Sequence, residues 1–314
     1  VGPLPLGRWT TCSWLPVSAS SGLGSRGREV ITLTLVRAMR PRQWSKNLLV
    51  VVAPLGAGTL FEAPVLLATG LDFIAFCLAA SATYLVNEVM DVERDRSHPV
   101  KKDRPLASGA LPVWVALMTA VIIGVGALVN GFLTNAPLGW VIVAYMSVTV
   151  AYSVHFKNAP VLELALLALG FLLRAVGGGA ASDIPLSNWF LLVAGFGSLF
   201  MAAGKRFAEL SRRLESGSDG PVRGSLAGYS LSYLRFVWTT AAAVTVTTYC
   251  LWAVEVGGGT SIPWAMLSII PFALGILRYA VDIDRGSGEA PDEALLSDRS
   301  LAALGMAWVV LFGL

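Results

Sequence analysis

The chain has 314 residues, of which 55% are hydrophobic and only 14% are charged, and its formal net charge at pH 7 is +3. A soluble domain carries about 25% charged residues, so this composition argues against a soluble enzyme and favours an integral membrane protein. The three cysteines have no CxxC spacing, which argues against a disulfide framework and a zinc site.

In chain order, a polar leader comes first and a series of apolar runs follows. Residues 1–35 are rich in Gly, Ser and Pro, and we predict a disordered N-terminal extension there. Residues 36–314 are predicted to form one catalytic domain, an all-α integral membrane bundle of about nine transmembrane helices, because each span needs roughly 20 apolar residues. The apolar runs lie near residues 47–61, 67–90, 112–132, 137–155, 160–180, 187–204, 236–256, 262–281 and 299–314.

Basic residues fall in every second connection between these runs. The intervening connections, at 61–64, 130–137, 177–188 and 255–263, contain no Lys or Arg. By the positive-inside rule, the basic connections are expected in the cytoplasm. The pattern therefore predicts a multi-pass protein of the plasma (inner) membrane whose active site faces the cytoplasm.

The stretch NEVMDVERD at 87–95 places acidic side chains directly after an apolar run. Asn87, Asp91 and Asp95 are spaced i, i+4, i+8 and would share one face of a helix, with Glu88 one position round it. Such a ladder suits Mg²⁺, which binds one or two carboxylates while it keeps waters and substrate phosphates. The alternative is a solvated acidic helix end that pairs with neighbouring arginines.

Several short basic segments are expected at the same membrane surface as this acidic ladder. Cations beside a carboxylate-held metal suit a diphosphate, whose remaining oxygens need neutralising. Each segment alone is also explained by topology or by interfacial anchoring, and Lys205 could simply pair with Glu209 four residues later. The candidate substrate-binding residues are Arg40, Lys46, Glu88, Lys101, Arg104, Tyr152, Lys157, Lys205, Arg206 and Glu209.

Arg174 lies well inside the apolar run at 160–180, and it shares a helix face with Glu163, about three turns away. It should face the bundle interior, and we expect a structural role, with a ligand contact as the alternative.

The glycine runs at 177–179 and 257–259 are expected in outside connections, and no Walker A, GxSxG or HExxH motif is present. Because the basic residues flank a membrane, no nucleic-acid partner is expected.

NEVMDVERD resembles NDxxDxxxD, the first Asp-rich motif of the UbiA superfamily of intramembrane prenyltransferases. The resemblance implies nine helices, a pocket that faces the cytoplasm, and diphosphate bound through Mg²⁺, with Asn87, Asp91 and Asp95 as catalytic and metal-binding residues. Glu88 stands where the family usually has Asp. Ordinary members carry a second Asp-rich cluster where this chain has the largely basic GKRFAEL, which favours direct contact with phosphate and substrates richer in phosphate.

The segments RPRQWSKN, YSVHFKN and GKRFAEL resemble one branch of that superfamily, over roughly residues 35 to 314. That branch transfers 5-phosphoribosyl from phosphoribosyl diphosphate (PRPP) to decaprenyl phosphate, releases diphosphate, and serves arabinan synthesis for the cell wall. The resemblance implies Mg²⁺ as cofactor and PRPP, decaprenyl or a similar polyprenyl phosphate, and membrane lipids as partners; it leaves a homo-oligomer open. Two rivals also stay open, namely prenyl transfer from a prenyl diphosphate to an aromatic or haem acceptor, and a transporter or lipid-binding protein.

Overall fold

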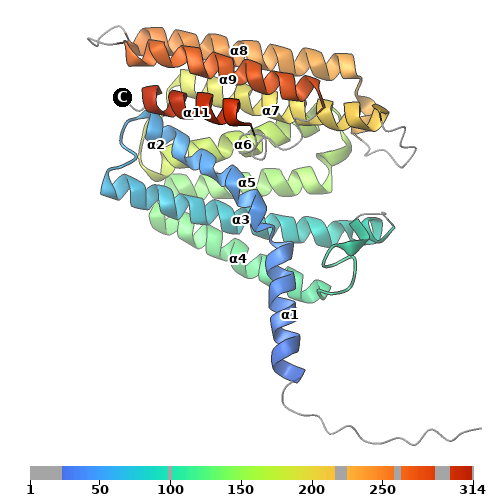
Figure 1. Ribbon diagram of the computed structural model, residues 1–314. Helices are drawn as coiled ribbons and strands as arrows, with labels where there is room; N and C mark the ends of the chain where they lie inside the picture. The colour runs from blue at the N-terminus through green and yellow to red at the C-terminus, as the bar shows by residue number, and fades with distance from the viewer. Residues whose placement is uncertain (1–22, 98–100, 216–224, 258–262, 287–297, 313–314) are drawn as a thin grey trace, which may run out of the picture.

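The computed structural model describes residues 23–97, 101–215, 225–257, 263–286 and 298–312, and it contains helices but no strand in these ranges (Figure 1). Four short 3₁₀ helices, η1 to η4, connect or precede the α-helices. The elements are α1 (Leu23–Ala38), η1 (Pro41–Val51), α2 (Val52–Gly56), α3 (Ala63–Arg96), η2 (Lys101–Asp103), α4 (Val113–Thr134), α5 (Ala136–Val154), η3 (Phe156–Asn158), α6 (Leu162–Ala181), α7 (Asn188–Glu215), η4 (Leu226–Gly228), α8 (Leu231–Gly257), α9 (Trp264–Asp284) and α11 (Arg299–Phe312).

Seven of the described helices, α3 to α9, are long and apolar enough to cross a membrane. The all-α membrane bundle predicted from the sequence is therefore confirmed, while the count of about nine spans is not. The first predicted span folds as η1 and the five-residue α2, and the last is the 14-residue α11. Pro41 and Pro54 in the first of these segments limit the regular hydrogen bonding that a long helix needs.

Helix α1 occupies part of the segment predicted to be a disordered extension. Residues 1–22 lie outside the described residues, but the chain is helical from Leu23 onward. Figure 1 shows α1 crossing the direction of the spans and projecting away from them. Its last residue, Ala38, is buried and packs with Leu85 of α3 and Ala116 of α4, and this contact fixes the end of α1 against the bundle.

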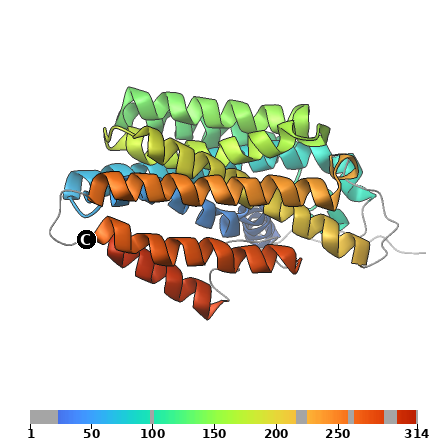
Figure 2. The ribbon, with the colours of Figure 1, turned by 90° about the horizontal axis from the view of Figure 1, so that it is seen from above.

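The spans lie side by side, and α3, α5 and α7 each have one end toward the right of Figure 1. Two buried clusters hold them together. One is centred on α7, α8 and α9 and includes Phe200 and Trp238, and the other joins η1, α3 and α5 through Phe76 and Tyr145. Figure 2 shows the same arrangement from above, with α9 and α11 side by side at one edge.

The length of α3 carries its polar end beyond the apolar layer. Its 34 residues correspond to about 50 Å, against roughly 30 Å for the hydrocarbon core of a bilayer. The apolar part comes first, so the turns that contain Asn87, Asp91 and Asp95 lie towards the membrane surface. One end of the bundle is thereby supplied with carboxylates on a rigid helix.

Gly177–Gly179 lie inside α6, so the prediction that this glycine run forms an outside connection was wrong. The reason is close packing. A Cβ on Gly178 would come within 1.9 Å of the Val50 carbonyl oxygen, and one on Gly177 within 2.5 Å of the Phe76 ring. The absence of side chains lets η1 and α3 pack directly against the α6 backbone.

Candidate active site

A polar cavity of about 240 Å³ opens between η1, α3, α5, α6 and α7. Four cationic side chains line it, and none of the described residues in its wall is acidic. Hydroxyl groups of tyrosine, serine and threonine, together with the Asn87 amide, complete the polar wall. Such a wall suits a ligand with several negative charges. The cationic residues are Arg40, Lys46, Arg174 and Lys205.

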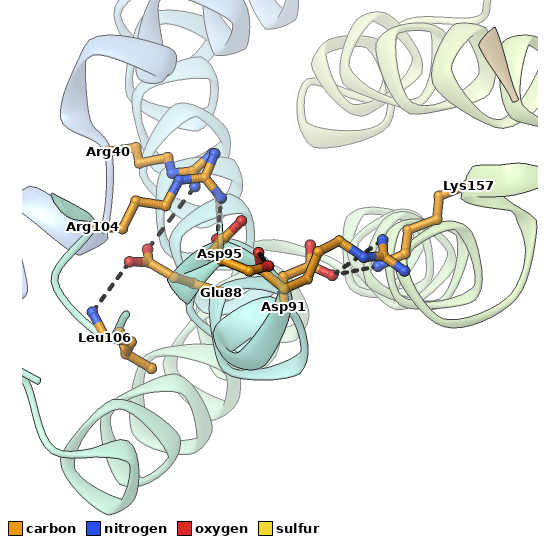
Figure 3. Close-up of polar contacts among 9 residues, drawn as sticks. Arg40, Glu88, Asp91, Asp95, Arg104, Leu106 and Lys157 are labelled. Atoms are coloured by element: carbon orange, nitrogen blue, oxygen red, sulfur yellow. Dashed lines mark hydrogen bonds and ion pairs between the residues drawn. The ribbon is translucent and has the colours of Figure 1, made fainter. Parts of the chain in front are cut away.

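The acids of α3 lie next to this cavity and are paired with cations from other segments (Figure 3). Lys157 Nζ of η3 is 2.6 Å from Asp91 Oδ1, and Arg104 Nη1 is 2.5 Å from Asp95 Oδ2. The two carboxylates point to different sides of α3 in Figure 3. Both are hard oxygen donors one helical turn apart, held at the cavity by basic groups.

Glu88 is buried on the side of α3 that faces the turn before η1. Its Oε1 accepts a hydrogen bond from the Leu106 backbone N–H at 3.4 Å, and Arg40 Nη2 lies 3.9 Å from its Oε2 (Figure 3). Arg40 has a left-handed backbone conformation, with φ 55°, and its guanidinium lies over the Tyr84 ring. Glu88 thus connects the segment after α3 with the turn that places Arg40 in the cavity wall.

Arg206 is 2% exposed and does not line the cavity. Its guanidinium forms two hydrogen bonds with the Glu163 carboxylate, through Nε and through Nη2, the latter at 2.9 Å. Nη1 donates to Glu209 Oε2 at 2.6 Å, and Nη2 also donates to the Tyr152 hydroxyl at 3.3 Å. The group joins α5, α6 and α7, and in this arrangement its charge is neutralised by the protein.

A strained turn precedes α6 and sets the direction of Glu163. Val161 has φ 68°, in the left-handed region that a β-branched residue rarely adopts. Its N–H donates to the Tyr229 hydroxyl at 2.7 Å, and Gly228 approaches Pro160 so closely that a Cβ would lie 2.5 Å from its ring. Burial raises the pKa of Tyr229 to about 12, so the phenol stays neutral at physiological pH.

The structure brings five of the sequence-predicted residues into the wall of the cavity. Those residues are Arg40, Lys46, Asn87, Tyr152 and Lys205. The ion pairs around its mouth, described above, contain Glu88, Asp91, Asp95, Arg104 and Lys157. Arg206 and Glu209 belong to the buried group of side chains around Glu163. Lys101 lies in η2, away from the described wall.

Sequence reasoning missed Tyr145, Thr83, Thr149 and Ser153, which also line the cavity. Tyr145 and Thr149 are four residues apart, as expected for one face of α5. In the sequence, however, they stand among apolar residues and resemble ordinary packing positions. Arg174 was singled out but given a structural role; the structure places it in the cavity wall.

One apolar cavity adjoins the polar one, and a second apolar cavity adjoins the first. Phe171 and Met201 line both the polar cavity and an apolar cavity of about 350 Å³. A further apolar cavity of about 230 Å³ shares Val52, Phe272 and Trp308 with the second one. Together they provide an anion-binding end and an apolar end, which is the arrangement that a lipid with a phosphate head group requires.

Residues 48–309 match the model of the UbiA prenyltransferase family. The decaprenyl-phosphate phosphoribosyltransferase of Mycobacterium tuberculosis is 46% identical over 283 residues, covering 89% of this chain and 93% of that protein. The protein of the same name from Corynebacterium glutamicum is 45% identical over 281 residues, with 88% and 84% covered.

Among solved structures, a UbiA homolog from Archaeoglobus fulgidus bound to GPP and Mg²⁺ superimposes with a TM-score of 0.67 at 17% identity, covering 89% of this chain and 98% of that one. At that identity the likeness shows the fold alone. The family match spans most of the chain, and the relatives agree with it over nearly their whole length. The chain belongs to the UbiA prenyltransferase family.

Proposed function

We propose that this protein transfers the 5-phosphoribosyl group of PRPP to decaprenyl phosphate or a similar polyprenyl phosphate and releases diphosphate. The main support for this proposal is the composition of the cavity wall, which has four cationic side chains and no acidic side chain among its described residues. The two substrates together bring several phosphate groups, whereas an aromatic or haem acceptor would bring fewer. The relatives that are 45–46% identical bear the name of this activity.

Mg²⁺ fits the acids at the mouth of the cavity. Magnesium in phosphate-transferring sites binds one or two carboxylates and completes its shell with water and substrate phosphate. Asp91 and Asp95 each supply such a carboxylate, but on different sides of α3, so one ion would bind one of them unless their side chains turn toward each other; Asn87 adds an amide oxygen in the cavity wall. Among the described residues, no group of three His, Cys, Asp or Glu side chains is placed to hold a metal alone.

When bound, Mg²⁺ would stabilise the negative charge that develops on the departing diphosphate. The chain itself positions the reactants. Asp91 and Asp95 would hold the Mg²⁺ that binds the diphosphate end of PRPP, and Lys157 and Arg104, now paired with these acids, would neutralise phosphate oxygens. Arg40, Lys46 and Lys205 line the space in which the remaining phosphates would bind.

The reaction exchanges one bond at C1 of the ribose for another. The bond between C1 and the diphosphate oxygen breaks, and its electron pair leaves with diphosphate. A lipid phosphate oxygen forms the new bond to C1. A phosphate monoester is anionic near neutral pH, since its second pKa is about 6, so no side chain has to remove a proton.

The site is proposed to face the cytoplasm of a plasma-membrane protein. The acids of α3, the basic segment of α7 and the basic η3 all lie at one end of the bundle (Figure 1). PRPP is water-soluble and would enter from that side. The polyprenyl chain would occupy the apolar cavities and continue into the bilayer.

A donor exchange tests the proposal against the rival prenyltransferase activity. Purified protein in detergent is given Mg²⁺ and decaprenyl phosphate with labelled PRPP, or an aromatic acceptor with a labelled prenyl diphosphate. We expect labelled lipid only from PRPP. Efficient prenyl transfer without phosphoribosyl transfer would overturn the proposal.

A further inference from the structure

Arg174 is a buried cation that no described carboxylate neutralises. It is 5% exposed, and the three acceptors to which it donates are all neutral. Nε donates to Asn47 Oδ1 at 2.7 Å, Nη1 to the Gly170 carbonyl at 2.6 Å, and Nη2 to the Tyr145 hydroxyl at 2.8 Å. Burying a charge without a counter-charge is costly, particularly within a membrane bundle, so this arrangement favours an anionic ligand.

The partners of Arg174 fix the guanidinium without using all its donors. A guanidinium has five N–H groups, and the three bonds to neutral acceptors leave one N–H on each terminal nitrogen. Among the described residues no further acceptor is bonded to them. Asn47 is itself fully buried, and the Tyr145 ring lies 4.7 Å from the guanidinium carbon. The cation is therefore held in place before a ligand arrives.

The position of Arg174 distinguishes the two ends of the cavity. Phe171, whose ring lies 5.6 Å from the Arg174 guanidinium carbon, lines both the polar cavity and the adjoining apolar one. Arg174 thus lies close to the boundary between the two cavities, three residues along α6 from Phe171. The acids Asp91 and Asp95 are absent from the described lining of either cavity and lie at the mouth.

We propose that Arg174 binds the phosphate of the polyprenyl phosphate acceptor, with the polyprenyl chain passing Phe171 and Met201 into the apolar cavity. The inference rests on the proposed function and deepens it, because it assigns the deep end of the polar cavity to the acceptor and its mouth to PRPP. The ribose of PRPP would lie between the two. Arg174 is then a substrate-binding residue for the lipid.

The test compares Arg174→Gln with the unaltered protein for each substrate separately. Loss of a charge-assisted hydrogen bond should raise the KM for polyprenyl phosphate about 10- to 100-fold and leave the KM for PRPP within about twofold. Arg174→Lys keeps the charge but not the fork of donors, and it should give an intermediate rise. Arg235→Gln removes an exposed arginine paired with Asp284, and it serves as the matched control, with both KM values unchanged.

A binding measurement separates recognition of phosphate from a merely structural role. Binding of a short-chain prenyl phosphate and of the matching prenol is measured in detergent by calorimetry. The unaltered protein and Arg174→Lys should prefer the phosphate, and Arg174→Gln should bind the two about equally. If Arg174→Gln does not fold, the preference of Arg174→Lys and its larger KM for the lipid decide the matter.

Three results would overturn the inference. Arg174→Gln could raise the KM for PRPP alone, which would place the donor at Arg174, or it could keep the preference for the prenyl phosphate. An Arg174→Lys protein whose lipid KM equals that of the unaltered protein would also contradict it. Failure of the proposed function looks different, since the unaltered protein would then transfer no phosphoribosyl group to any lipid phosphate.

Discussion

Asp91 is the residue whose change tests the acidic site most sharply. Asp91→Asn preserves size but removes the charge that a metal would bind and that Lys157 now neutralises at 2.6 Å. We expect kcat/KM to fall about 10²- to 10³-fold, as when one electrostatic group is removed from a preorganised site. The measurement is the initial rate of lipid labelling over a Mg²⁺ titration.

Glu93→Gln is the matched control for this variant. Glu93 lies two residues away on the same helix, its side chain is 83% exposed, and it pairs only with Arg96 in the described structure. Its rate and Mg²⁺ response should stay within about twofold of the unaltered protein, since exposed ion pairs contribute little. An Asp91→Asn protein with the normal rate and Mg²⁺ response would remove Asp91 from the site.

Glu163 and Arg206 should behave as a buried ion pair. Glu163→Gln leaves the Arg206 charge buried with Glu209 as its remaining carboxylate partner, so we expect a loss of about 3–5 kcal/mol in the free energy of unfolding. The double change Glu163→Leu with Arg206→Met removes both charges and should recover much of that loss. Unfolding in detergent with increasing denaturant measures both, and a Glu163→Gln protein as stable as the original would contradict the assignment.

At this scale the sequence predicted which residues lie near one another better than how they pair. Asp91, Asp95, Lys157 and Arg104 were all expected at one site, and the structure does bring them to one end of the bundle. Their pairing was not predictable, because Lys157 is 66 residues from Asp91 and any of several cations could have reached it. The burial of Arg206 was missed for the same reason, since its partner Glu163 lies on another helix.

At the scale of helices, Gly178 predicts a sharp difference between two Gly→Ala substitutions. A Cβ at Gly178 would meet the Val50 carbonyl oxygen at 1.9 Å, whereas one at Gly275 in α9 would meet nothing within 4 Å. We expect Gly178→Ala to lower the free energy of unfolding by about 1–3 kcal/mol or more, because backbone cannot move aside cheaply. Gly275→Ala should be neutral or stabilising by up to about 1 kcal/mol.

Thermal unfolding of the two variants in detergent checks this comparison. Equal melting temperatures would mean that η1 does not pack directly against α6.

The close packing of this glycine run could not be predicted from the sequence. Apolar periodicity predicted the long helices, but a glycine run has the same appearance in a connection and in a tightly packed helix, and only the contact with Val50 distinguishes them.

For the whole molecule, the bundle has one polar, charged end and an apolar interior. The proposed cytoplasmic orientation predicts which end an impermeant maleimide reaches in intact cells. In a background without the native cysteines, Phe61→Cys at the end without basic connections should be labelled, since Phe61 is 86% exposed. Glu93→Cys should be labelled only after the membrane is permeabilised; the opposite pattern would place the site outside.

Composition and charge alternation were enough to predict a membrane bundle with one charged end. The apolar runs at 47–61 and 299–314 are already the shortest, but composition could not predict that the first folds as η1 and the five-residue α2, because this depends on packing against α6. Nor could it place Arg174 close to the boundary between a polar and an apolar cavity. That depends on side chains from η1, α5 and α6 meeting in space.

In the proposed reaction, the ribose of PRPP is transferred to the lipid and its diphosphate is not. PRPP carrying one label in the ribose and another in the diphosphate is incubated with the protein, decaprenyl phosphate and Mg²⁺, with and without EDTA. We expect the ribose label to enter the lipid phase, the diphosphate label to stay in water, and EDTA to abolish the transfer. Both labels in the lipid, or neither from folded protein with Mg²⁺, would contradict the proposed reaction.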